Sequence, residues 1–267
     1  MTCSVADVIQ VIEKLAPVDL ASSWDNAGLQ VGARTWPVET VWVALDPLPE
    51  VVSDACEAKV DMLLTHHPLI FKPLNAVDVA TQEGAIIQTA IQHSLAIYAA
   101  HTNLDMANDG VNDTFAFKIG LKNIAPLAAS LEDDMQNFLR VGFLSEETTL
   151  IDFARRIKKN LDADSVKIAG NANLKIKKVA ICSGSGSSLL SAFFISGADV
   201  FVSGDLKYHD ARTVEGAGKG LVDIGHFASE HMMVEVFSKR LGQRLKDEGK
   251  GVRVEPYRFE KDPFVVV

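Results

Sequence analysis

The chain has 267 residues, and its 35 acidic side chains against 26 Lys and Arg give a formal net charge of −9. This charge argues against a general duplex-DNA binder, which needs clustered basic side chains, and no apolar stretch is long enough to predict a transmembrane helix. With 48% hydrophobic and 23% charged residues, the composition predicts a globular protein of one large domain or two closely associated ones.

The N-terminal segment predicts an amphipathic helix. Val8, Ile9, Val11, Ile12 and Leu15 recur at helical spacing. The same segment contains two acids and no basic region, so it does not resemble a signal peptide.

The rest of the first half alternates strands with helices. β-rich runs predict strands over 40–46, 60–67 and 95–101. Helical patterns lie over 49–59, 81–94 and 109–119, the last with Asp109 as the expected N-cap.

The alternation resumes after residue 125. Strands are expected over 138–144, 165–170, 176–184, 198–205 and 220–225. Helices are expected over 148–161, 187–197, 206–216 and 226–245, with Gly197 as a C-cap. This order predicts an α/β fold of two related βαβ-type lobes, with mixed, largely parallel sheets. The histidines and acids described below add the expectation of a metal site between the lobes at strand ends. We expect an N-terminal lobe over 1–125 and a second lobe over 126–267.

Two series of elements support the idea of related lobes. Each series has the order β-α-β-α-β, and each third strand ends in a histidine that is followed four residues later by an acid. These pairs are His101 with Asp105 and His226 with Glu230. The alternative is that any two α/β units share such an alternation of strands and helices.

His66 and His67 close an apolar strand just before Pro68. In open parallel sheets, ligands bind beyond the carboxyl ends of the strands. Two adjacent imidazoles there could each bind one metal ion of a pair. The alternative is a polar strand end with hydrogen-bonded histidines.

His226 and Glu230 stand four residues apart on the first turn of a predicted helix, so both side chains lie on one face. Imidazole and carboxylate are ligands for Zn, Fe, Mn or Co, although such a pair is more often found on a surface. Asp105 could be a further ligand or could begin a turn. His101 could be a ligand, an outer partner or a proton carrier. Because three predicted strand ends each bring such groups to one edge, the sequence favours a multinuclear metal site.

Weaker signals surround these residues. The turn from Ser183 to Ser188 could cradle a phosphate at a helix N-terminus, or could be a tight βα turn. His209 could act as an acid or base near the metals, or could be exposed beside a helix-capping Asp205. Three widely spaced cysteines without a C-x-x-C motif argue against a disulfide framework and favour a reducing cytoplasm.

Five motifs together resemble the Nif-three-like family, whose bacterial members are commonly labelled GTP cyclohydrolase I type 2 homologues. In chain order they are WDNAGLQVG (24–32), LTHHP (64–68), HTNLD (101–105), SGDLKYHDA (203–211) and GHFASE (225–230). The resemblance runs from about Val8 to Val254. The chain length is similar to that of the compact members, which lack an inserted domain.

The resemblance implies a dinuclear centre of two divalent ions (Fe, Zn, Mn or Co) in each subunit. Its implied ligands are His66, His67, Asp105, His226 and Glu230, with Glu230 bridging. It implies His101 as an additional site histidine, and a toroidal homohexamer with its sites facing an interior cavity.

Two functions follow as expectations. The first is a metal-dependent hydrolase acting on a purine nucleotide such as GTP, or on a related phosphorylated small molecule, with His101 and His209 transferring protons. The second is a non-catalytic protein that binds, senses or delivers metal. Neither a membrane nor a nucleic acid is an expected partner.

Overall fold

The computed structural model describes residues 3–127 and 138–267 and divides the chain into two compact units. Unit 1 contains Met1–Asn108 and Met233–Glu260, and unit 2 contains Asp109–Met232 and Lys261–Val267. The expected boundary at residue 125 therefore differs from the observed one. Helix α5 (Val111–Lys118) contributes to the hydrophobic core of unit 2, and the C-terminal strand β11 (Arg253–Pro256) pairs with the sheet of unit 1.

Unit 1 is built on a five-stranded sheet in the order β1-β4-β3-β2-β11. Only β1 runs antiparallel to its neighbour; the other pairs are parallel. The remaining strands are β1 (Gly28–Val31), β2 (Thr40–Ala44), β3 (Met62–Thr65) and β4 (Ala96–Ala99). The helices are α1 (Val5–Leu15), the 3-10 turn η1 (Val18–Leu20), α2 (Pro49–Glu57), α3 (Gln82–Gln92), α4 (Thr102–Met106) and α10 (Met232–Asp247).

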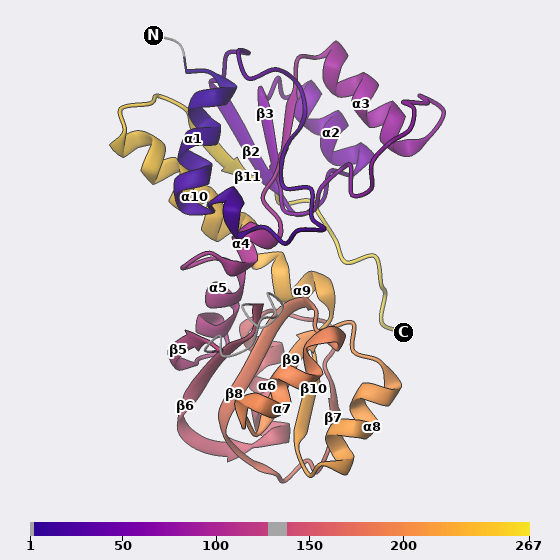
Figure 1. Ribbon diagram of the computed structural model, residues 1–267, viewed down its shortest axis with the longest axis vertical. Helices are drawn as coiled ribbons and strands as arrows, with labels where there is room; N and C mark the ends of the chain where they lie inside the picture. Colours follow the sequence, from indigo (N-terminus) through magenta and orange to yellow (C-terminus); the bar gives the residue numbers. More distant parts are fainter. Residues whose placement is uncertain (1–2, 128–137) are drawn as a thin grey trace. The chain divides into compact units, whose positions relative to one another are not determined.

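Helices cover both faces of this sheet. Figure 1 shows α2 and α3 on one side and α1 and α10 on the other. The central strands β3 and β4 are buried along their whole length, as expected for parallel strands that are covered on both faces. This explains why their sequences are continuous apolar runs rather than alternating ones.

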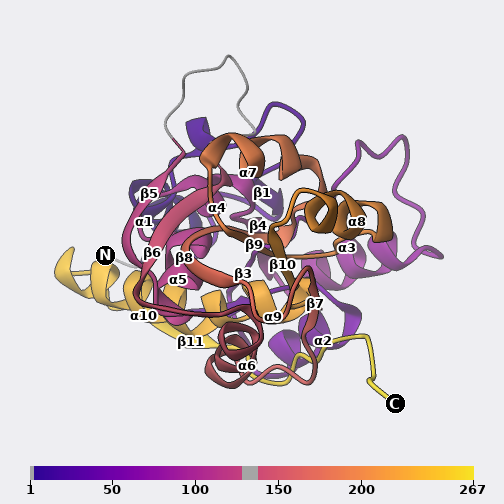
Figure 2. The same cartoon turned by 90° about the horizontal axis from the view of Figure 1, so that it is seen from below.

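Unit 2 contains a six-stranded sheet in the order β5-β6-β8-β9-β10-β7. Strands β8, β9 and β10 are parallel, while β5, β6 and β7 pair antiparallel. The strands are β5 (Lys122–Pro126), β6 (Arg140–Thr149), β7 (Lys167–Ala169), β8 (Lys175–Ser185), β9 (Val200–Gly204) and β10 (Gly220–Asp223). The further helices are α6 (Leu150–Asn160), η3 (Ser187–Leu189), α7 (Leu190–Ser196), α8 (Tyr208–Gly216) and α9 (His226–Glu230). Helix α6 lies on one side of the sheet and α7 and α8 on the other (Figure 2).

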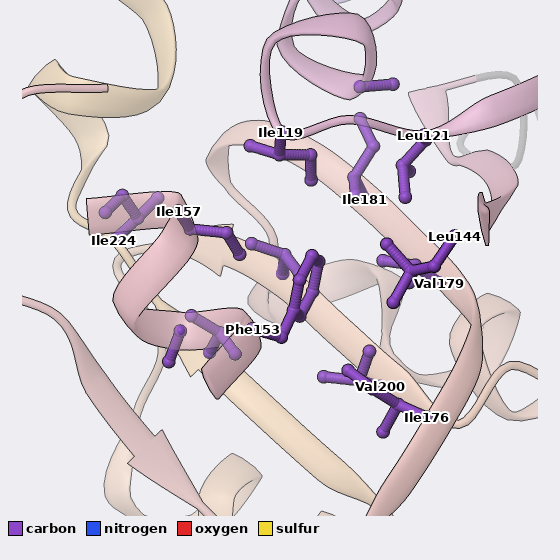
Figure 3. Packing of buried hydrophobic residues seen from close by; sticks show 14 of the residues in the cluster. Ile119, Leu121, Leu144, Phe153, Ile157, Ile176, Val179, Ile181, Val200 and Ile224 are labelled. Atoms are coloured by element: carbon purple, nitrogen blue, oxygen red, sulfur yellow. The ribbon is translucent and has the colours of Figure 1, made fainter. Parts of the chain in front are cut away.

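A hydrophobic core of unit 2 lies under α6. Phe153 and Ile157 of that helix point at apolar side chains of the strands, as Figure 3 shows for Val179 and Val200. Thr149 begins the helix by accepting a hydrogen bond from the backbone N–H of Asp152. The cap fixes where α6 begins, and the apolar stripe determines which face is buried.

The two units share an order of elements. In each, three parallel strands are joined by helices, an antiparallel strand flanks the third, and a five-residue helix follows it. These short helices are α4, with His101 as its N-cap, and α9, which begins at His226. The expectation of an α/β fold with mixed sheets is confirmed.

Some element predictions were wrong. The helix expected over 226–245 is two helices, α9 and α10, because the chain leaves the helical hydrogen-bonding pattern of α9 at His231 and passes from unit 2 to unit 1 immediately after Met232. The N-cap of α5 is Gly110 rather than Asp109, whose positive φ of 53° is incompatible with the extended backbone of a cap. In the described part of the chain, no helix combines the length and apolar character needed to cross a membrane.

Candidate metal centre

His66 lies directly after β3 and is completely buried. Its Nδ1 is 2.9 Å from the backbone oxygen of Ala100. A carbonyl can only accept, so Nδ1 carries the hydrogen and Nε2 carries the lone pair. Nε2 lies 3.6 Å from Oδ1 of Asp105, a buried residue of α4.

His67, the next residue, is oriented in the same way by a different acceptor. Its Nδ1 lies 2.7 Å from Oδ1 of Asp46, which follows the neighbouring strand β2. The carboxylate holds the hydrogen on Nδ1 and directs Nε2 away from it. Neighbouring strand ends therefore supply both the histidine and the group that fixes its orientation.

His101, at the start of α4, donates from Nδ1 to Oδ1 of Asp25 over 2.8 Å. The second oxygen of Asp25 accepts hydrogen bonds from the backbone N–H and the hydroxyl of Thr102. Burial raises the pKa of Asp25, but the hydrogen bonds from His101 and Thr102 outweigh it and lower the pKa to about 2. Asp25 is therefore a fixed carboxylate near neutral pH.

These three histidines form one cluster within unit 1. The ring centroids are 5.1 Å apart for His66 and His67, 5.3 Å for His66 and His101, and 5.6 Å for His67 and His101. Each ring offers one nitrogen, and these nitrogens lie within 4.8 Å of one another. The cluster could therefore hold a metal ion.

Two aromatic rings flank the outer side of this cluster. Trp24 and Phe71 both meet the His101 ring nearly edge-on, at centroid distances of 6.0 and 6.4 Å. Their segments are tied together by the Asn26 side chain, which donates to the backbone oxygen of Ile70. The start of the WDNAGLQVG motif therefore borders the candidate site in unit 1.

Unit 2 contains a second group of candidate ligands. His226 donates from Nδ1 to Oδ2 of Asp205, 2.8 Å away, and its Nε2 lies 3.0 Å from Oε2 of Glu230. The Glu230 side chain is only 5% exposed, whereas that of His226 is 36% exposed. The predicted pairing of these residues on one helix face is therefore present in α9.

All four histidines share one feature. In each, an oxygen acceptor holds the hydrogen on Nδ1, so that Nε2 is the nitrogen able to coordinate a metal. Metal-binding histidines almost always have such a partner on the other nitrogen, which fixes the tautomer and the ring orientation. Neutral imidazole nitrogens and buried carboxylates also suit divalent first-row metals. The residues therefore fit a metal centre.

The sequence prediction missed most of the supporting acids. Asp46 was not singled out, Asp25 appeared only within the WDNAGLQVG motif, and Asp205 was noted as a helix cap. Asp46 and Asp205 each lie within two residues of the end of a parallel strand. The same signal, a polar residue at a strand end, had identified His66 and His67.

His209 lies on α8 and is exposed, with its ring edge-on to Tyr208 at 5.3 Å. Its role as a proton carrier stays a prediction. The meeting of the unit 1 residues and the unit 2 residues in one centre also stays a prediction.

Comparison with known proteins gives the same family over nearly the whole chain. The family model described as Duf34/NIF3 (NGG1p interacting factor 3) matches residues 3–263. A Clostridium perfringens protein named GTP cyclohydrolase 1 type 2 homolog is 34% identical over 258 residues, which cover 97% of each chain. This equal coverage agrees with the expected compact form.

Solved structures agree with this match. A Bacillus cereus protein related to NIF3 has a TM-score of 0.92 at 26% identity and covers 100% of both chains. A Staphylococcus aureus protein has a TM-score of 0.90 at 31% identity and covers 99% of both. The arrangement of the elements is therefore shared with known structures along its full length.

Proposed function

The chain belongs to the Duf34/NIF3 family, and from this premise we propose that it is a dinuclear metal-dependent hydrolase. The proposed ligands are His66, His67, Asp105, His226 and Glu230. Unit 1 supplies the first three and unit 2 the last two. Glu230 is the proposed bridge, because one carboxylate has two oxygens to share between two ions.

The observation that carries the proposal is the common orientation of the histidines. Nδ1 is hydrogen-bonded to an oxygen in His66, His67 and His226, at 2.7–2.9 Å. In all three residues, Nε2 is therefore the nitrogen available to coordinate an ion. The buried carboxylates of Asp105 and Glu230 supply the negative charge that divalent ions need.

When bound, divalent ions in such a site supply Lewis acidity and lower the pKa of water. The protein contributes the proton transfers. His101 is the better placed candidate, because Asp25 fixes its tautomer and its ring adjoins those of His66 and His67. His209 is the second candidate and is proposed on the family resemblance.

We propose an anionic substrate, either a purine nucleotide or a related phosphorylated small molecule. Asp105 and Glu230 offset about two of the roughly four positive charges that two divalent ions would bring, so the ions themselves would still attract an anionic group. The carboxylates of Asp25, Asp46 and Asp205 lie on the far side of the histidines, where they bind Nδ1. The name of the Clostridium perfringens relative, GTP cyclohydrolase 1 type 2 homolog, makes GTP the first substrate to test.

The test compares metal-reconstituted protein with a His66→Ala, Glu230→Ala double variant. Both are screened for turnover of GTP, other nucleotides and model phosphoesters. Turnover that appears only in the metal-loaded wild type supports the hydrolase. Equal turnover in the two proteins, or none in either, contradicts it. If the wild type also binds metal without turnover, the second function, a protein that binds, senses or delivers metal, takes its place.

A further inference from the structure

The glycine-rich turn between β8 and α7 adjoins the candidate metal ligands of unit 2. The sequence alone left open whether this turn, Ser183–Ser188, cradles a phosphate. Its hydrogen bonds, and the room that its glycine leaves for a neighbouring side chain, favour a different role.

Several backbone amides of the turn are already used within the protein. The N–H of Ser183 donates to Oδ1 of Asn112 at 2.7 Å, and the N–H of Gly184 donates to Oγ of Ser229 at 2.8 Å. The N–H of Gly186 donates to the backbone oxygen of Gly204 at 3.3 Å. A phosphate cradle depends on amides that point at the ligand, so this turn is poorly suited to be one.

The missing side chain of Gly184 makes room for a carboxylate. A Cβ atom built on Gly184 would overlap Oε1 of Glu230 and would lie 3.4 Å from Cε1 of His226. The backbone of Gly184 also has a positive φ of 61°, which side-chain-bearing residues rarely adopt. Both the space and the conformation therefore require glycine at this position.

Ser229 connects the turn to the helix that carries the ligands. Its hydroxyl accepts from Gly184 and donates to the backbone oxygen of His226 at 2.7 Å. Ser229 is completely buried and lies next to Glu230 in the chain. The serine thus holds α9 against the end of β8 through one hydroxyl.

The end of the neighbouring strand follows the same principle. A Cβ on Gly204, the last residue of β9, would lie 2.7 Å from the backbone oxygen of Gly184 and 2.7 Å from the backbone nitrogen of His226. Gly184, the second-to-last residue of β8, and Gly204, the last residue of β9, therefore both lie directly against the chain around α9.

We infer that the glycine-rich turn positions the Glu230 carboxylate, and that Gly184 and Ser229 are the residues that position this metal ligand. The inference rests on the proposed role of Glu230 as a ligand. It assigns the turn to the metal centre of the protein rather than to a phosphate group of a substrate.

The test is a titration of the metal-free, full-length protein with Co²⁺, followed by its absorption spectrum. Gly184→Ala should weaken binding of at least one ion by about 10- to 100-fold, as expected when a group that supports a ligand is lost. Gly218→Ala is the matched control, because Gly218 has a similar φ of 71° but nothing within 4 Å of its built Cβ. Equal Co²⁺ affinities for Gly184→Ala and Gly218→Ala would overturn the inference.

A double variant tests the cause of the loss. Glu230→Asp shortens the ligand by one methylene and withdraws it from the space over residue 184. The cost of Gly184→Ala should therefore shrink to less than about 3-fold in the Glu230→Asp background, as expected for two residues in contact. An undiminished cost in that background would show that the alanine acts in another way and would contradict the inference.

Two further variants complete the design. If Gly184→Ala does not fold, the titration is repeated with Ser229→Ala. A folded Ser229→Ala variant that binds Co²⁺ with the affinity of the wild type would overturn the inference. Glu230→Gln tests the proposed function separately. If Glu230→Gln loses Co²⁺ binding while Gly184→Ala binds like the wild type, only the positioning role of the turn is refuted. If Glu230→Gln itself binds like the wild type, the role of Glu230 as a ligand is refuted.

Discussion

Nδ1 of His67 lies 2.7 Å from Oδ1 of Asp46, so that the end of one parallel strand fixes the imidazole at the end of the next. The same relationship recurs between His226 and Asp205 in unit 2, at 2.8 Å. In both cases the carboxylate determines which ring nitrogen can coordinate a metal. Asp46 and Asp205 can therefore be part of the candidate site without touching an ion.

Replacement of Asp46 by alanine should weaken metal binding without unfolding the protein. The His67 ring would lose the acceptor that fixes its tautomer, and such losses cost about 10- to 100-fold in affinity. Titration of the metal-free variant with Zn²⁺ or Co²⁺ measures the effect. The control is Glu57→Ala, which removes an exposed acid at the end of α2, and equal affinities for the two variants would argue against the outer role of Asp46.

The pKa of Asp25, lowered to about 2, predicts an acid-dependent part of the stability. A carboxyl group whose pKa is lower in the folded than in the unfolded state stabilises the fold above its unfolded pKa, and this contribution is lost as the pH falls. For Asp25 the window runs from about pH 4 to about pH 2, with a contribution on the order of 2 kcal/mol.

Urea unfolding of metal-free protein checks this prediction. Asp25→Asn should be less stable than the wild type at pH 6, and the difference should shrink by pH 3. A difference that is the same at both pH values would show that the loss comes from packing rather than from the ionised carboxylate.

The core under α6 should determine the stability of unit 2. Phe153 is completely buried in the cluster of Figure 3, and truncation of a buried Phe to Ala costs about 3–5 kcal/mol. Urea unfolding of Phe153→Ala measures this loss. The matched control is Phe117→Ala on α5, where the side chain is 75% exposed, and a comparable loss in the control would contradict the packing account.

The segment between β3 and α3 is the proposed contact surface of the expected toroidal homohexamer. Phe71, Leu74, Val77 and Val79 are all at least 42% exposed there, and clustered exposed apolar side chains are typical of protein contacts. Light scattering should give a hexamer for the wild type and smaller species for Val77→Asp. Ile195→Asp, at an equally exposed site on α7, should remain hexameric, and a monomeric wild type would contradict the proposed assembly.

The ligand candidates could be predicted from the sequence because they follow strands with a strong signal. The strand before His66 and His67 is an apolar run, and the carboxyl end of a parallel strand is a common site position. The structure places both residues there and brings His101 to them, although His101 is separated from His67 by a helix and a strand.

Other features depend on contacts that local sequence does not encode. Asp25 is 76 residues from His101 in the chain, so nothing in either segment predicted their pairing. Strand β11 contains Arg253, Glu255 and Pro256 and has a weak strand signal, but it pairs with β2 and thereby returns the C-terminal region to unit 1. The break between α9 and α10 was also missed, because the helical periodicity continues across His231.

The most direct test of the metal centre is anomalous scattering from crystals grown with the metal that the protein carries when purified. The account predicts two anomalous peaks for each chain, about 2.0–2.2 Å from Nε2 of His66, His67 and His226 and from the carboxylates of Asp105 and Glu230. A chain without such peaks, or with peaks beside Nδ1 of these histidines, would contradict it.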